Sequence, residues 1–317
     1  MNKKTNFRTG YGIAVICFLL MNCNLLTGCG SDDKTKVSDS LTKGKINISV
    51  DESFKPVIEE HIKVYEASYP DATIIAHYKP EAECFRDLLK DSATRMIIVT
   101  RGLNYREERF FIDSLNYVPV WNDVASDAIT IVVNNKSTDT LFTIARLKKQ
   151  LTGGLGKKET IVFDGLTATS TIRYAMDSIL HGQPFDTSVV KAVKSSREVL
   201  EYVASNVNAI GFVGISWIGN PEDSAQVNML KKVKMAYVEC DKCADSPYVK
   251  PTQSGILSER YPLVRGLYYI VKENYNGLGS GFANFLQYER GQLIFKRAYL
   301  GARMGFTIRN VKIKEKL

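Results

Sequence analysis

The feature that most constrains this chain is an alternation of short apolar runs with amphipathic helical patterns, which begins near residue 45. Ile46, Ile48 and Val50 alternate with polar residues and so predict a strand, and Pro70 closes the helical pattern that follows. The same alternation predicts strands over 45–50, 73–77 and 96–99, and helices over 57–69, 85–89 and 107–115. Since each connection is short, this segment predicts an α/β lobe with a largely parallel sheet.

A further set of elements indicates a second lobe. Two strands with little between them, over 117–121 and 128–134, are expected to cross from one lobe to the next. The strand expected over 261–271 is long enough to return to the first lobe. The remaining elements are helices over 143–151, 173–180, 199–204 and 282–299, and strands over 161–163, 209–214, 233–238 and 307–313.

The N-terminus has the pattern of an export signal. Three basic residues precede an apolar core over 11–20, which is too short for a comfortable membrane span and leads to Leu26-Thr27-Gly28-Cys29. This ending resembles the processing site of bacterial lipoproteins. It implies a signal peptide over 1–28 and Cys29 as the lipidated first residue.

The segment that follows the expected lipid predicts a flexible tether over 29–44, because it is rich in Gly, Ser, Asp, Lys and Thr. Its Ser31-Asp32-Asp33 run resembles the acidic signal that sends some Bacteroidetes-type lipoproteins to the cell surface. We therefore expect a lipid-anchored protein of the cell envelope, facing the periplasm or lying on the outer-membrane surface.

Composition and motifs argue against several functions. With 44% hydrophobic and 24% charged residues, the chain has the composition of a globular protein. Its net charge is +8, but the lysines are scattered along the sequence, so we expect no nucleic-acid partner. The sequence has no H-E-x-x-H or G-x-S-x-G motif, and the glycine-rich run ending at Gly156-Lys157 continues with Lys158 where a P-loop needs Ser or Thr. We expect no enzymatic activity and no cofactor.

Two cysteines have the spacing of a redox pair or a zinc half-site, namely Cys240 and Cys243. No second C-x-x-C or H-x-x-x-H motif completes a zinc site, and the three histidines are far apart in sequence. The spacing therefore favours a local disulfide in an oxidising compartment over a metal site. Cys84 has no role that the sequence identifies.

The stretch from Asp164 to Arg173 is the first candidate for a ligand site. It follows a predicted buried strand, precedes a predicted helix and carries hydroxyls at Thr167, Thr169, Ser170 and Thr171. Free backbone N–H groups at a helix N-terminus attract anions. Ser and Thr are also favoured as ordinary N-caps, so both interpretations stay open at this point.

Six blocks occur in a characteristic order: Thr100-Arg101-Gly102-Leu103 with Glu107-Glu108, Val118-Pro119-Val120 through 127–134, Ile144–Gly153, Val199–Gly214, Tyr261-Pro262-Leu263-Val264-Arg265, and Gly291-Gln292 with Tyr299. Together they resemble the PstS-type phosphate-binding proteins of the periplasmic binding protein class, over about residues 45–313. The resemblance implies the two-lobed type II fold, an α/β fold whose lobes are joined by two crossing strands and close on a ligand by hinge motion. It places lobe 1 at 45–125 with 259–317, and lobe 2 at 126–258.

The resemblance also implies which residues meet an anion in the cleft. These are Ser53 and Phe54 after the first strand, Thr100 and Arg101 at the end of the third strand, and Thr169, Ser170 and Thr171 in the place of the family's Ser-Gly-Thr.

The sequence departs from the family where charge matters most. The family has an arginine just upstream of Ser-Gly-Thr, where this chain has Asp164, and Glu81 and Glu83 stand in a loop that is Ser/Gly-rich in the family. Carboxylates near an anion would repel it. Arg173 or Arg101 is a candidate substitute for the missing arginine, while Arg265 is expected to anchor the return strand to a carboxylate.

Two functions remain open from the sequence. The first is a lipoprotein that captures phosphate or a related oxyanion for an ABC permease. The second is an envelope accessory or sensor protein that uses the same fold with an altered or lost phosphate site, for example as a protein linked to a TonB-type energy-transducing complex.

Overall fold

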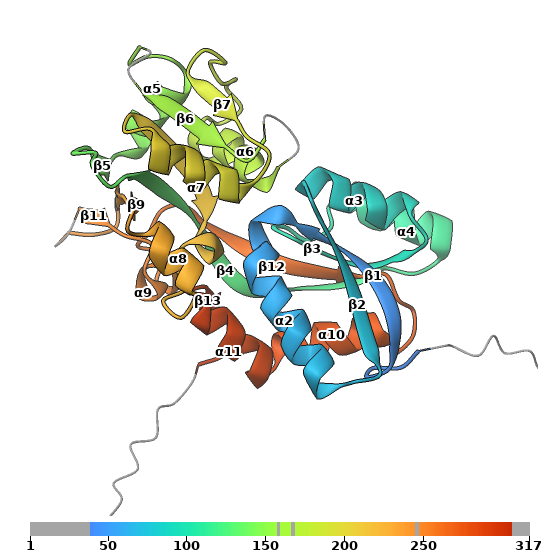
Figure 1. Cartoon of the computed structure of the whole chain (residues 1–317). Coiled ribbons are helices and arrows are strands. Elements are labelled where there is room, and N and C mark those ends of the chain that lie inside the picture. The colour runs from blue at the N-terminus through green and yellow to red at the C-terminus, as the bar shows by residue number, and fades with distance from the viewer. Residues whose placement is uncertain (1–38, 157–158, 166–168, 245–246, 306–317) are drawn as a thin grey trace, which may run out of the picture. The chain divides into compact units, whose positions relative to one another are not determined.

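A computed structural model describes residues 39–156, 159–165, 169–244 and 247–305 of the chain (Figure 1). In these ranges, strands join into one continuous sheet with the order β2-β1-β3-β12-β4-β8-β6-β7, and β13 and β9 also pair with β4. The predicted lipidation site Cys29, the predicted signal peptide and the predicted strand over 307–313 lie outside the described residues.

The first lobe is built on the alternation that the sequence predicts. β1 (Gly44–Asp51) pairs in parallel with both β2 (Ala72–Lys79) and β3 (Thr94–Val99), and β12 (Val264–Val271) lies antiparallel beside β3. The expected strands and the largely parallel sheet are therefore confirmed.

Helices cover both faces of this sheet, and β3 shows why. Met96 and Ile98 belong to the main core, whereas Ile97 and Val99 belong to a smaller core with Cys84 and other residues of the connecting helices. Successive strand residues point to opposite faces, so an uninterrupted apolar strand needs a helical layer on each side. The helices that follow the first three strands are α2 (Lys55–Ser68), α3 (Glu81–Lys90) and α4 (Tyr105–Leu115).

One long strand, β4 (Val120–Asn134), links the two lobes (Figure 1). Its first part pairs with β12 and its last part pairs with β8 (Ala209–Gly214). The expectation of two separate strands here is wrong. Polar residues in the middle of β4, including Ser126 and Asp127, gave the appearance of a break, but both are buried within the strand.

The second lobe repeats the parallel arrangement. β8 pairs in parallel with β6 (Thr160–Phe163), which pairs in parallel with β7 (Val190–Ala192). Its other elements are η4 (Ile215–Trp217), α5 (Ile144–Leu151), α6 (Ser170–Tyr174), the π-helical turn η3 (Ala175–Ile179), α7 (Ser196–Ser205), α8 (Ser224–Met229) and β9 (Val233–Met235).

The remaining elements include several that the sequence did not predict. A small sheet has the order β11-β10-β5. The bounds are β5 (Leu141–Phe142), β10 (Tyr237–Glu239), β11 (Tyr248–Val249), η2 (Glu52–Phe54), α9 (Gln253–Leu257), α10 (Leu278–Gln287), α11 (Glu289–Arg297) and β13 (Gly301–Ala302).

The single helix expected over 282–299 is wrong, because α10 and α11 meet at Tyr288, which is extended (φ −96°, ψ 176°). The two helices pack closely after this bend. A Cβ atom on Gly291 would lie 2.1 Å from the carbonyl oxygen of Phe285, so the close approach requires glycine.

The folded part of the chain begins inside the expected tether. Asp39 accepts hydrogen bonds from Arg95 Nη2 (3.1 Å), from the Tyr275 hydroxyl (3.1 Å) and from the backbone N–H of Leu278 (3.2 Å). Residues 39–44 are therefore held against the first lobe, and the expectation of a tether up to residue 44 is corrected at its C-terminal end.

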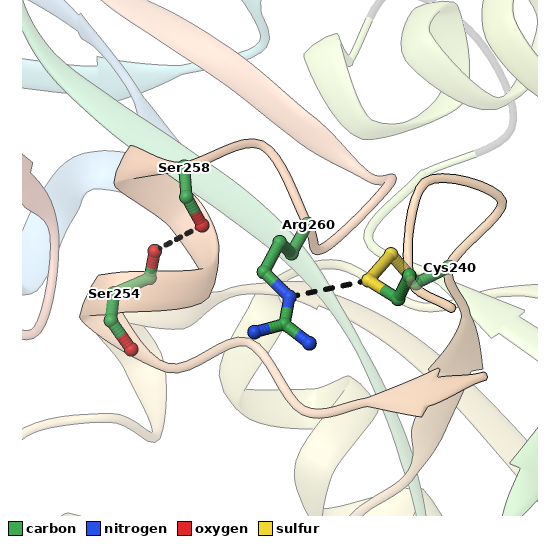
Figure 2. The surroundings of a disulfide bond; sticks show 5 residues. Cys240, Ser254, Ser258 and Arg260 are labelled. Carbon is green, nitrogen blue, oxygen red and sulfur yellow. Dashed lines mark hydrogen bonds between the residues drawn. A yellow bond between two sulfur atoms is a disulfide. The ribbon is translucent and has the colours of Figure 1, made fainter. Parts of the chain in front are cut away.

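The two C-x-x-C cysteines are bonded to each other, and Figure 2 shows their surroundings. Arg260 Nε donates a hydrogen bond to Cys243 Sγ (3.2 Å). Cys84 is a buried free thiol, so it packs as a small apolar residue. Within the described ranges, no cluster of three or more His, Cys, Asp or Glu side chains is placed to hold a metal ion, and no helix is long and apolar enough to span a bilayer.

Candidate functional site

Polar side chains from both lobes meet where the parallel strands end. Ser53 follows β1 and Ser216 follows β8, and Ser216 Oγ donates to the carbonyl oxygen of Ser53 (2.8 Å). The hydroxyls of Ser53 and Ser170 lie 3.3 Å apart. Ligands of open α/β sheets bind outside the carboxyl ends of the strands. We call the following residues the cleft cluster: Asp51, Glu52, Ser53, Glu81, Thr100, Asp127, Asp164, Ser170, Arg173, Ser196 and Arg265.

Arg265 on β12 lies at the centre of the cleft cluster. Its Nε donates to Asp127 Oδ2 (2.8 Å) and its Nη1 donates to Ser170 Oγ (2.8 Å). Its Nη2 is buried and has no hydrogen-bond partner among the described residues. Burial alone would lower the pKa of Arg265, but the charges of Asp127 and Asp51 raise it, so the side chain stays a cation. A buried guanidinium with an unused N–H group is a donor available to an oxyanion.

The short helix α6 brings Ser170 to this position. Thr169 is its N-cap, and the Thr169 hydroxyl accepts a hydrogen bond from the backbone N–H of Ile172 (3.3 Å). Thr171 Oγ1 donates to Asp164 Oδ2 (3.3 Å). Ser170, Thr171 and Ile172 are buried, so the start of α6 is fixed by packing as well as by its cap.

Glu81 holds a second group of donors. Its Oε1 accepts from the backbone N–H of Thr100 (2.9 Å) and from Thr100 Oγ1 (2.5 Å), and its Oε2 accepts from Arg173 Nε (2.7 Å). Arg173 Nη2 also donates to Thr100 Oγ1 (2.6 Å). Burial alone would raise the pKa of Glu81, but the hydrogen bonds and charge of Arg173 more than offset it and lower that pKa.

The cleft cluster carries more carboxylates than guanidinium groups. Burial raises the pKa of Asp51 to about 7, helped by the charge of Glu81, and burial raises the pKa of Glu52 to about 7 as well. Burial also raises the pKa of Asp164. Glu52 accepts a hydrogen bond from Ser196 Oγ (2.7 Å) on the second lobe. Near neutral pH, some of these carboxyls therefore hold protons and can donate hydrogen bonds themselves.

A groove of about 970 Å³ lies next to the cleft cluster. Of the cluster it is lined by Glu52, and it also contacts Ser216, Tyr78, Trp217 and the exposed Arg197. It does not reach Arg265, Thr100 or Ser170. The buried Arg265 guanidinium and the hydroxyls beside it are therefore in the cluster, whereas the groove has basic side chains of its own, Lys55, Arg197 and Arg297.

The structure brings together Ser53, Thr100, Ser170 and Arg173 from the residues that the sequence singled out. The ring of Phe54 lies 5.3 Å from the Arg265 guanidinium. Arg101 is engaged elsewhere, since its two terminal nitrogens each donate to Glu107 at 2.8 Å. Thr167 lies outside the described residues.

Sequence reasoning missed Arg265, Asp51 and Glu52 as members of the site. Arg265 does pair with a carboxylate, as expected, but its other nitrogens face the cleft cluster. A charged residue inside the otherwise apolar and aromatic run of β12 was the available signal.

Comparisons with known proteins identify the family and the fold of the chain. A family model described as a PBP superfamily domain matches residues 35–290. The chain is similar to a solved structure from Clostridium perfringens, described as a phosphate ABC transporter substrate-binding protein with bound phosphate, with 18% identity, a TM-score of 0.66, and coverage of 82% of this chain and 100% of that chain.

A second similar structure is an ABC-type phosphate transport receptor from Vibrio cholerae, with 18% identity, a TM-score of 0.57, and coverage of 80% of this chain and 98% of that chain. At these identities the likeness shows the fold, which is the two-lobed fold of the periplasmic binding proteins. A search of curated proteins found no matching sequence.

Proposed function

We propose that this chain, which belongs to the PBP superfamily, is a non-enzymatic solute-binding protein that holds phosphate or a related oxyanion in the cleft cluster. The observation that carries the proposal is the buried Nη2 of Arg265, which has no hydrogen-bond partner among the described residues. It lies on the same guanidinium that binds Ser170, whose hydroxyl lies beside that of Ser53. Charge-assisted hydrogen bonds from a guanidinium, with hydroxyls beside it, suit an oxyanion.

The cluster supplies an oxyanion site in spite of its carboxylates because two of them are easily protonated. A protonated Asp51 or Glu52 donates a hydrogen bond to an oxyanion instead of repelling it. We expect Arg265, Ser53 and Ser170 to contact the ligand directly, with Asp127 holding the Arg265 guanidinium in place.

The wider setting follows from the same proposal. The similar structures are named as parts of phosphate ABC transport, so an ABC permease is the expected partner. The expected signal peptide and the expected lipid on Cys29 would attach the protein to an envelope membrane outside the cytoplasm.

A second candidate function is an envelope accessory or sensor protein whose oxyanion site is altered. One observation favours it, because the donors of Thr100 and Arg173 are already used by Glu81 within the chain. Neighbouring permease and ATPase genes would support transport, while TonB-type genes would support this second candidate.

Calorimetric titration of the full chain in detergent with phosphate, sulfate and molybdate tests the first candidate. We expect one site per chain, and a rise in unfolding free energy of about 2.7 kcal/mol at 100 times the Kd. The double variant Ser53→Ala and Ser170→Ala should lose at least about tenfold in affinity, whereas the exposed control Ser188→Ala should not. Absence of heat and of thermal stabilisation with all three anions at millimolar concentration rejects the oxyanion proposal.

A further inference from the structure

Glu81 has the hydrogen-bond partners that a bound oxyanion would have. We propose that Glu81 limits the affinity for oxyanions by occupying, as a built-in carboxylate, an oxyanion subsite formed by Thr100 and Arg173. The proposal rests on the proposed function, since it requires that oxyanions enter the cleft cluster.

The subsite is assembled from three kinds of donor around one carboxylate. Glu81 is only 3% exposed and receives a backbone N–H and a hydroxyl from Thr100, and Nε–H from Arg173. Backbone N–H groups, hydroxyls and guanidinium groups are the donors that bind phosphate and sulfate in proteins. A carboxylate and an oxyanion therefore compete for the same atoms.

The fold gives Glu81 an advantage in that competition. Pro80 directly follows β2 and is the N-cap of α3, and Glu81 is the first residue of that helix. The carboxylate is delivered to Thr100 and Arg173 by a rigid connection, so it competes as an intramolecular ligand at high effective concentration. It also lies near the helix N-terminus, where negative charge is stabilised.

The subsite spans the two lobes and borders the donors that remain. Thr100 follows β3 in the first lobe, and Arg173 lies one turn after Ser170 on α6 in the second lobe. Glu81 also interacts electrostatically with Arg265 and Asp51. An oxyanion that binds Arg265 therefore meets the charge of Glu81 and cannot use Thr100 and Arg173 unless it displaces this carboxylate.

Removing the carboxylate tests the proposal. Sulfate and inorganic phosphate are titrated into the full chain at constant ionic strength. Glu81→Ala should raise the affinity for both at least tenfold, because it frees the donors and removes a repulsive charge. Glu81→Gln removes the charge and turns one oxygen into an NH2 donor, but its remaining oxygen can still accept from Thr100, so it should give a smaller gain. Thermal unfolding of both variants reports whether they fold.

Two matched variants separate the subsite from a general effect of charge. Glu83→Ala removes the same charge from the same helical turn but makes no hydrogen bond with the cleft cluster, so it should change affinity less than about twofold. Adding Arg173→Ala to Glu81→Ala should cancel the gain. An unchanged affinity in Glu81→Ala, an equal gain in Glu83→Ala, or a gain that persists without Arg173 overturns the proposal.

The same titrations separate this proposal from the proposed function. If the native chain binds neither anion and Glu81→Ala binds both, the native oxyanion function fails and the role of Glu81 holds. If the native chain binds tightly and Glu81→Ala binds no more tightly, the function holds and the role of Glu81 fails. If neither protein binds, both proposals are rejected.

Discussion

At the scale of single residues, Arg265 is the side chain on which the proposed site depends. It is buried, pairs with Asp127 and donates to Ser170, and so connects the return strand, the shared strand β4 and helix α6. A buried ion pair has little net stabilising value by itself, because both charges lose their water. A function for this buried pair is better sought in what the remaining guanidinium nitrogen can bind.

Asp51 and Glu52 predict how stability depends on pH. Their pKa values are about 7 in the folded chain against ordinary values of 3.8 and 4.5, so they hold protons that the unfolded chain has lost. At these two carboxyls folding therefore takes up protons between about pH 4 and about pH 7. Burial lowers the pKa of His61 to about 4, so this one imidazole acts in the opposite direction but is outweighed by the two carboxyls. The unfolding free energy should therefore fall as pH rises through this window. Urea unfolding at several pH values measures the fall.

The neighbours of Asp51 and Glu52 determine which variants test this pH dependence. Asp51 faces Glu81, Arg265 and Ser170, and Glu52 faces Ser196 and Asp164. Glu52→Gln keeps an oxygen that accepts from Ser196 and should weaken the fall in stability to the part that Asp51 contributes, whereas Glu60→Gln on the exposed face of α2 should leave the fall unchanged. A rise in stability between pH 4 and pH 7 in the native chain would contradict the prediction.

Part of the site was predictable at this scale. Ser53 and Thr100 follow neighbouring parallel strands, so their placement at the same edge of the sheet follows from topology. The sequence did not show which carboxylate each arginine pairs with, because this depends on distances between elements that are far apart in the sequence. Arg101 binds Glu107, while Arg173 binds Glu81, and both arginines were equal candidates from the sequence.

At the scale of elements, α6 and α5 offer a matched pair of helix caps. Thr169 caps α6 beside the cleft cluster, and Thr143 caps α5 away from it, through a hydrogen bond from the backbone N–H of Arg146 (2.9 Å). Each Thr→Ala change should lower the unfolding free energy by about 1 kcal/mol. Chemical denaturation measures this cost.

Only the first of these changes should weaken sulfate binding. Loss of the Thr169 cap loosens Ser170 and Arg173, whereas loss of the Thr143 cap leaves both in place. Equal effects of the two variants on sulfate affinity would show that α6 has no special part in the site.

The elements with a regular apolar period were predictable, and those interrupted by polar residues were not. β1, β3 and β8 agree with their patterns to within about two residues at each end. β4 was divided in error because Asp127 lies within it as a buried partner of Arg265. A pattern of hydrophobicity does not reveal a buried charge whose partner is 138 residues away.

At the scale of the whole molecule, β4 and the core argue for one cooperative unit. β4 pairs with strands of both lobes, and a single apolar core contains Ile48 of the first lobe and Phe163 of the second. We expect the two lobes to unfold in one transition. The order of the six sequence blocks was sufficient to predict this two-lobed fold, because together they resemble a family that has it.

The two tryptophans of the chain make this expectation measurable. Trp121 lies at the start of β4 beside β12, and Trp217 lies in η4 after β8. Trp217→Phe leaves a reporter on the first lobe, and Trp121→Phe leaves one near the second. In each variant, the unfolding midpoint measured by tryptophan fluorescence should coincide with the midpoint measured by circular dichroism, which reports on the whole chain. Separate midpoints within one variant by the two methods would mean that the lobes unfold independently.

The central position of β12 has a consequence for how the chain acquires its structure. β12 lies between β3 and β4, yet it is made of residues 264–271, late in the sequence. Until it arrives, both neighbouring strands keep an unpaired edge, and their pairing must close a long loop, which slows folding. A growing chain therefore stays without its middle strand for most of its synthesis. For a chain with an expected export signal, we expect this delay to keep it extended enough for translocation, with folding completed on the far side of the membrane.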